Sequence, residues 1–157
     1  MSTILPRSLC ASQMSGVEFR AAADRQVYGR GDPIVLHLSV VNNTERDITI
    51  WRTSFFTNHR IVIKNARGMF PEMTENGRRA SRLFDPGVER MGNFPVLLAP
   101  GKRDKTLDAV TLSDLFVLPE GTYYANIIYE DYQCTGFSGI LCSNEIAFEV
   151  VGPSFNK

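Results

Sequence analysis

A strict alternation of apolar and polar residues recurs along this sequence, and it constrains the fold more than any other feature. In residues 34–41 (IVLHLSVV), every even position is Ile, Leu or Val, whereas His37 and Ser39 take the opposite parity. Residues 123–130 (YYANIIYE) and 145–151 (EIAFEVV) alternate in the same way. Because successive side chains of a strand point to opposite faces of its sheet, these segments predict half-buried strands.

Shorter strand candidates lie at residues 17–21, 48–51, 60–64, 96–98 and 106–111. The polar stretch 42–47 (NNTERD) separates residues 34–41 from residues 48–51 and predicts an antiparallel hairpin between them. Helix signals are weak, and only residues 112–116 (LSDLF) predict a single helical turn. These features favour an all-β fold, an antiparallel immunoglobulin-like β-sandwich of about seven to nine strands.

The chain length suits one domain, because 157 residues can enclose a single core of ordinary size. We expect residues 16–152 to form the sandwich, residues 1–15 to form a flexible N-terminal tail, and residues 153–157 to form a C-terminal tail. Residues 65–94 break the strand pattern with two prolines and four glycines. We expect one long irregular insertion there, with a short hairpin as the alternative. Such segments in compact domains are frequently functional.

Charge and hydropathy narrow the classes of partner. Lys and Arg together number 17, as do Asp and Glu, so the chain lacks the basic excess typical of nucleic-acid binders. No stretch approaches the ~20 apolar residues that span a bilayer, so we expect no membrane insertion. The first 15 residues lack the apolar run of a secretory signal. We therefore expect a cytoplasmic protein as the sequence stands, or a periplasmic or secreted one if an export signal has been removed.

The three cysteines are Cys10, Cys134 and Cys142, and an odd count argues against a dense disulfide framework. Cys134 and Cys142 lie eight residues apart in the sequence CTGFSGILC. In an oxidising compartment these two cysteines can close a small loop disulfide, whereas in a reducing compartment they remain free thiols. The sequence leaves both states open.

No constellation of reactive residues stands out. The two histidines, His37 and His59, lie 22 positions apart and have no zinc-ligand spacing with the cysteines. We expect His37 on a strand surface and His59 in a loop. Met69, Met73 and Met91 contain the thioether that copper(I) prefers, but packing of loop residues on the sandwich edge explains them better. We therefore predict no enzyme activity and no cofactor, with a metal-binding protein or a hydrolase as the alternative of another class.

The insertion 65–94 is rich in arginine and phenylalanine, and both residue types are enriched at interface hot spots. We therefore expect a partner-binding surface formed by Arg67, Phe70, Arg78, Arg79, Arg82 and Phe84. The expected partner is another protein, and an enzyme is one candidate. Because edge strands can pair between copies, both a monomer and a homodimer are compatible with the sequence.

Four short motifs carry a resemblance to a known class of domain. They are YGRGDPI at residues 28–34, LAPGK at 98–102, PEGTY at 119–123 and SNEI at 143–146. In this order they resemble a bacterial immunoglobulin-like domain, the non-catalytic N-terminal domain of deuterolysin-like (lysine-specific) metallopeptidases. They are more distantly similar to the intracellular proteinase inhibitor family of bacilli.

The resemblance implies a fold and carries over no catalytic residue, because the metallopeptidase motif His-Glu-x-x-His is absent from this sequence. Tyr123 stands two residues after Gly121, where a tyrosine corner closes such a sandwich through its hydroxyl group. A complete set of sandwich signals without a constellation of reactive residues predicts a non-catalytic protein-binding domain. It would be either an inhibitor or immunity-type protein acting on a partner enzyme, or an accessory module of a secreted or envelope assembly.

Overall fold

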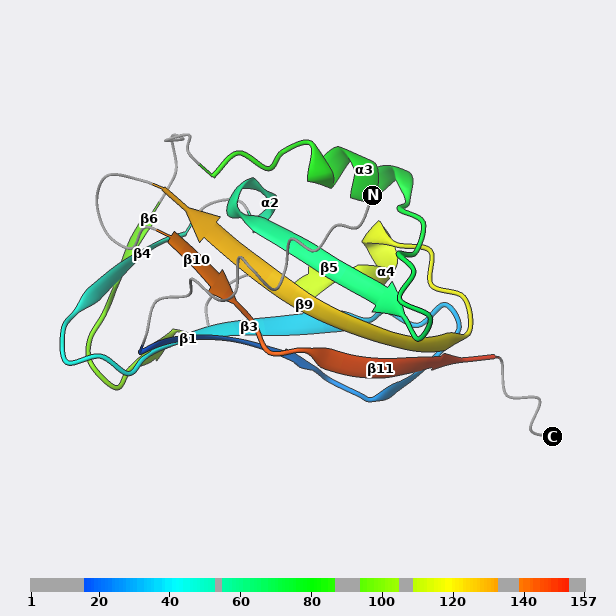
Figure 1. Cartoon of the computed structure of the whole chain (residues 1–157), viewed down its shortest axis with the longest axis horizontal. Helices are drawn as coiled ribbons and strands as arrows, with labels where there is room; N and C mark the ends of the chain where they lie inside the picture. Colours follow the sequence, from blue (N-terminus) through cyan, green and yellow to red (C-terminus); the bar gives the residue numbers. More distant parts are fainter. Residues whose placement is uncertain (1–15, 53–54, 87–93, 105–108, 133–138, 153–157) are drawn as a thin grey trace.

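A computed structural model describes residues 16–52, 55–86, 94–104, 109–132 and 139–152. Two sheets face each other across one hydrophobic core, and short helices cover one side (Figure 1). The predicted all-β antiparallel sandwich is therefore confirmed. The predicted tails, residues 1–15 and 153–157, lie outside the described residues. No helix in the described part of the chain is long and apolar enough to cross a membrane.

The first sheet is built on β3 (Val35–Asn42), the strand with the clearest alternation. One edge of β3 pairs with β1 (Val17–Ala23), and the other edge pairs with β7 (Arg103–Asp104) and β8 (Val110–Thr111). The even-numbered residues Leu36, Leu38 and Val40 are buried, while His37 is exposed. The period of two therefore assigned both faces of this strand correctly.

The second sheet is built on β9 (Gly121–Asp131). One edge of β9 pairs with β5 (His59–Asn65), and the other pairs in succession with β11 (Ile146–Val151) and β10 (Gly139–Cys142). The outer edge of β11 pairs with β2 (Val27–Gly29) in parallel, an exception to the antiparallel pairing. The two sheets thus form the opposed layers of a β-sandwich.

The predicted hairpin between residues 34–41 and 48–51 is wrong. Strand β4 (Ile48–Arg52) pairs with β6 (Phe94–Leu98) in a separate two-stranded ribbon. The buried Asn42 side chain explains the difference, because its Nδ2 donates to the carbonyl oxygens of Arg46 (2.7 Å) and Leu98 (2.8 Å). These two hydrogen bonds hold the turn after β3 against the end of β6. The chain therefore continues into β4 beside β6, and β4 does not pair with β3.

The described residues form eleven strands, more than the seven to nine expected. Strands β2, β7 and β10 account for the excess, because no predicted strand covers them. Strands β2 and β7 have three and two residues and carry no readable alternation. Strand β10 lies in what the sequence presents as a cysteine loop. Strand β8 forms the end of the strand predicted at residues 106–111.

Two side chains close the ends of the sandwich. The Tyr123 hydroxyl donates to the Pro119 carbonyl oxygen at 2.5 Å, so the predicted tyrosine corner is confirmed. On the β1 side, the side-chain amide of Asn144 makes two hydrogen bonds with the backbone of Ala21. Its Oδ1 accepts from Ala21 N, and its Nδ2 donates to Ala21 O, both at 3.0 Å. Asn144 therefore fills the edge of β1 as a neighbouring strand would.

Three helices are described: α2 (Phe55–Asn58), α3 (Glu75–Ser81) and α4 (Leu112–Leu115). The single turn of α4 was predicted, whereas α3 was not, so the expectation of a wholly irregular insertion at 65–94 is wrong. Thr74 caps α3 by accepting from Gly77 N at 3.1 Å. The sequence did not predict α3 because Gly77, in the interior of the helix, lowers the helix propensity of the segment.

Candidate functional site

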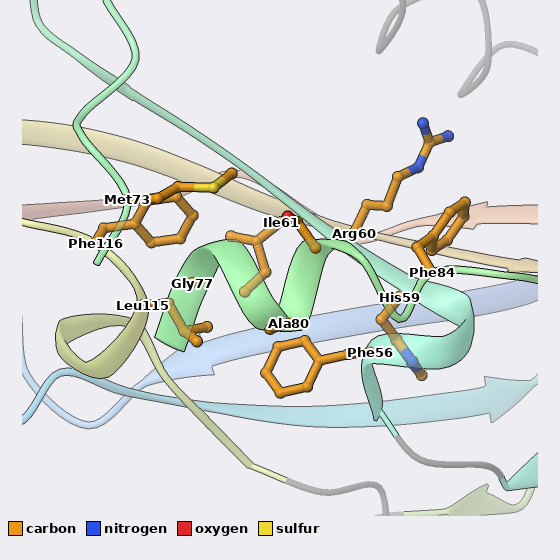
Figure 2. A pocket seen from close by; sticks show the side chains of 11 residues that line it. Phe56, His59, Arg60, Ile61, Met73, Gly77, Ala80, Phe84, Leu115 and Phe116 are labelled. Atoms are coloured by element: carbon orange, nitrogen blue, oxygen red, sulfur yellow. The ribbon is translucent and has the colours of Figure 1, made fainter. Parts of the chain in front are cut away.

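An apolar pocket of about 210 Å³ lies between the start of β5 and the helices α3 and α4. Phe56, Ile61, Leu115 and Phe116 belong to its apolar wall, and Gly77 and Ala80 of α3 border it. Figure 2 shows Met73 and Phe116 at one end of α3, and Phe84 and Arg60 at the other. The pocket has the size of a site for one large side chain rather than for a drug-sized ligand, which needs about 300 Å³ or more.

Close packing holds α3 in place over this pocket. A Cβ atom built on Gly77 would lie 2.1 Å from the carbonyl oxygen of Leu115, so only glycine permits this approach of α3 to α4. Two hydrogen bonds join the same elements. Thr74 N donates to Leu115 O at 2.9 Å, and the Thr74 hydroxyl donates to Asp114 O at 2.6 Å. The helix is therefore fixed at its N-terminal end, and the pocket is a preformed feature.

Arg60 and Phe84 lie at one end of the pocket, and Arg60 gives this end a positive charge. The Arg60 guanidinium carbon lies 4.8 Å from the centre of the Phe84 ring, a cation–π contact. Its Nη2 also lies 3.2 Å from Oε2 of the buried Glu130, whose other carboxylate oxygen accepts from the Tyr132 hydroxyl. That hydrogen bond raises the pKa of Tyr132. The Nε of Arg60 is shielded from solvent and has no hydrogen-bond partner among the described residues.

His59 also lines the pocket, and its predicted place in a loop is wrong. It begins β5 and is buried, with its ring stacked on Phe55 at 4.4 Å and edge-on to Tyr129 at 5.2 Å. Its Nδ1 lies 2.8 Å from the Phe55 carbonyl oxygen, which can only accept, so Nδ1 carries the proton. Burial lowers the pKa of His59 to about 4, and the ring is neutral near pH 7.

Of the six residues predicted to bind a partner, only Phe84 lines the pocket. Arg67 and Phe70 are exposed in the turn after β5, where Lys64 Nζ lies 6.0 Å from the Phe70 ring. Arg78, Arg79 and Arg82 are exposed on α3 or at its end. Arg79 pairs with Glu75 at 2.8 Å, and Arg78 donates to the Met73 carbonyl oxygen at 2.8 Å.

Sequence reasoning missed Phe56, Ile61, Leu115 and Phe116. These residues come from three separate segments, and the fold alone brings them together. One local signal was available for His59, because Phe55 precedes it by four residues, the spacing of neighbours on one helical turn.

The candidate metal ligands remain dispersed. His37 lies exposed on β3 as expected, Met69 and Met73 are exposed near α3, and Met91 lies outside the described residues. No group of three or more His, Cys, Asp or Glu side chains able to hold a metal ion occurs in the part of the chain that the structure describes. Cys142 at the end of β10 is disulfide-bonded. Cys134 lies outside the described residues, so its pairing with Cys142 stays a prediction.

No protein-family model and no curated protein matches this sequence. Among solved structures, the chain is similar to the CARDB domain of the PF1109 protein from Pyrococcus furiosus, described as a complex with di-metal ions. The identity is 13%, the TM-score is 0.43, and the match covers 86% of this chain and 87% of that domain. It is also similar to part of the β-glucosidase EmGH1 from Erythrobacter marinus, at 14% identity and a TM-score of 0.42. That match covers 86% of this chain and only 15% of the β-glucosidase.

Proposed function

We propose that this chain is a non-catalytic β-sandwich that binds a partner protein through the face formed by β5 and α3. The preformed apolar pocket beside α3 carries the proposal. A pocket of this size accepts one large side chain, and buried anchors in such pockets dominate the energetics of many interfaces.

Exposed apolar side chains on the same stretch of chain support this assignment. Met69 is 59% exposed, Phe70 is 57% exposed, and Leu83 is 45% exposed. All three lie in residues 66–85, the segment that follows β5, contains α3 and also carries four exposed arginines. Exposed large apolar residues with charged residues nearby in the chain are typical of protein interaction sites.

The finer role that we propose is inhibition of a partner enzyme. A rigid scaffold that holds apolar side chains on a connecting segment suits an inhibitor, which must present a fixed surface. An accessory role in a larger assembly uses the same face but leaves the partner's activity unchanged. The two roles therefore differ in the partner's activity and not in the binding surface.

The test uses a matched pair of substitutions. Leu83→Asp places a charge directly after α3, next to the pocket residue Phe84, whereas Leu97→Asp makes the same change on β6, at a residue that is 68% exposed. The partner is identified by capture from the native cell, and the 1:1 complex is then reconstituted from purified proteins. We expect Leu83→Asp to weaken binding at least tenfold and Leu97→Asp to leave it unchanged. Equal effects of the two variants, or failure to reconstitute a complex, would contradict the proposal.

A further inference from the structure

The open edge of β5 is the starting observation, and it follows from the hydrogen bonds of Ile127 on β9. Ile127 N donates to Ser143 Oγ, and Ile127 O accepts from Ser143 N, both at 2.8 Å. Ser143 follows β10, on the side of β9 opposite β5. In an antiparallel pair, facing residues exchange both backbone hydrogen bonds or neither. Because Ile127 faces Ile61, the Ile61 N–H and C=O groups must point away from β9.

No backbone hydrogen bond reaches Ile61 from its open side within the described residues. At one end of β5, Asn65 N donates to Met69 O at 2.8 Å, and before its other end Thr57 O accepts from Asp85 N at 2.8 Å. Ile61 itself is half-buried, whereas Ile63 is only 2% exposed. The unpaired edge is therefore short and centred on Ile61, whose N–H and C=O groups make no backbone hydrogen bond among the described residues.

The pocket lies on the same side as this edge. The Ile61 side chain packs against the core and lines the pocket between β5 and α3 (Figure 2). Residues that face each other on paired strands direct their side chains to the same face of the sheet. A residue of another chain that pairs with Ile61 would thus place its own side chain beside Ile61, in the apolar pocket.

Arg60 indicates which type of side chain should follow or precede the apolar anchor residue of the incoming chain. It neighbours Ile61 on β5, so its side chain takes the opposite face of the sheet, where it meets Glu130. Its side chain is 35% exposed, and its Nε has no hydrogen-bond partner among the described residues. The exposed Arg82 follows α3, on the chain segment that leads to Phe84. A residue adjacent to the apolar anchor would face Arg60, and an acidic side chain complements this charge.

We propose that the site binds an extended segment of a partner protein, which adds to β5 at Ile61 as one more strand. This segment carries a large apolar residue for the pocket and an acidic residue directly beside it. The inference rests on the proposed function and gives it a recognition mode, in which backbone hydrogen bonds supply affinity and one pocket supplies specificity. An amphipathic helix would instead present anchors three or four residues apart.

The first experiment selects ligands from a phage-displayed library of random linear dodecapeptides, using the whole chain as bait. We expect enriched peptides to share an acidic residue next to a Leu, Ile, Phe, Trp or Met. Repeating the selection on Arg60→Gln should remove the acidic preference and keep the apolar one. A consensus with helical spacing, or no enrichment at all, would overturn strand addition.

The second experiment measures amide hydrogen exchange with the best selected peptide bound. The Ile61 amide should slow at least tenfold, whereas the Val62 amide, which points toward β9, should not change. N-methylation of the peptide's anchor residue should weaken binding at least tenfold, and N-methylation of the adjacent acidic residue should not. One outcome separates the two proposals. If Leu83→Asp abolishes peptide binding but the bound peptide does not slow exchange of the Ile61 amide, strand addition is wrong and protein binding through this face is retained. If neither peptides nor a partner protein bind, both proposals fail.

Discussion

The imidazole of His59 lies flat against the ring of Phe55, with ring centroids 4.4 Å apart, and its Nδ1 donates to the carbonyl oxygen of the same residue at 2.8 Å. One phenylalanine therefore fixes both the position and the tautomer of the histidine. The arrangement suits a neutral ring, because a charged imidazolium in this apolar environment would lose its hydration.

The first prediction concerns pH. The pKa of His59 is lowered from 6.5 to about 4 in the folded state, so the unfolded chain takes up a proton more readily. The contribution of His59 to stability is complete above pH 6.5 and is lost as the pH falls toward 4. At about 1.4 kcal/mol per pH unit, the loss approaches about 3 kcal/mol. Urea unfolding at pH 7, 5.5 and 4.5 measures this loss of unfolding free energy.

The matched control for this prediction is the exposed His37. We expect His59→Phe to flatten the decline of unfolding free energy between pH 6.5 and 4.5, and His37→Phe to leave that decline as in the wild type. A decline that persists unchanged in His59→Phe would show that another group is responsible.

The second prediction concerns the contact of α3 with α4. Gly77→Ala places a Cβ atom 2.1 Å from Leu115 O, so α3 must shift away from α4. We expect a loss of about 1–3 kcal/mol, the usual range for overpacking. Asn76→Ala, at the preceding exposed position, should be neutral or slightly stabilising because alanine favours helix. Thermal unfolding of the two variants compares them directly, and equal melting temperatures would rule out the close contact.

The third prediction concerns the tyrosine corner. Tyr123→Phe removes the hydroxyl that donates to Pro119 O, and we expect a loss of about 1 kcal/mol. Tyr124→Phe makes the same chemical change at the next residue, whose side chain is exposed, and should have no measurable effect. Denaturant titration of both variants is the measurement. A loss in Tyr124→Phe as large as that in Tyr123→Phe would mean that the corner hydrogen bond adds nothing specific.

The fourth prediction concerns a buried amide. Both polar atoms of the Asn58 side chain are shielded and lack a hydrogen-bond partner among the described residues. Replacing them with apolar groups of similar size removes a desolvation cost, so Asn58→Leu should raise stability by about 1 kcal/mol or more. Asn42→Leu is the opposite case, because its amide donates to Arg46 and Leu98. We expect it to destabilise the fold, and the same sign for both variants would count against this explanation.

Local patterns predicted the strands well because alternation within a strand depends only on neighbouring residues. The faces of β3, the strand β9 and the corner at Tyr123 follow from such patterns. The pairing of strands could not be predicted in the same way, because it depends on distant residues. The Asn42 amide binds the carbonyl oxygen of Leu98 on β6, which is 56 residues away in the sequence. Nothing in the turn sequence itself indicates that contact.

The candidate site was predicted only in part, for the same physical reason. The sequence indicated the segment through its arginines and phenylalanines, and Phe84 does line the pocket. The remaining wall depends on Ile61, Leu115 and Phe116, which read as ordinary core residues until the fold places them around α3. The helix itself was hidden by Gly77, a residue that disfavours helices locally but permits the contact with Leu115.

The Asn144 amide has a consequence for the edge of the first sheet, because it occupies the backbone N–H and C=O groups of Ala21 on β1. In the second sheet, the backbone groups of Ile61 on β5 make no backbone hydrogen bond among the described residues. An edge strand with unpaired N–H and C=O groups is a template for pairing with another chain. A single side chain therefore blocks edge-to-edge association at Ala21 without the addition of a further strand.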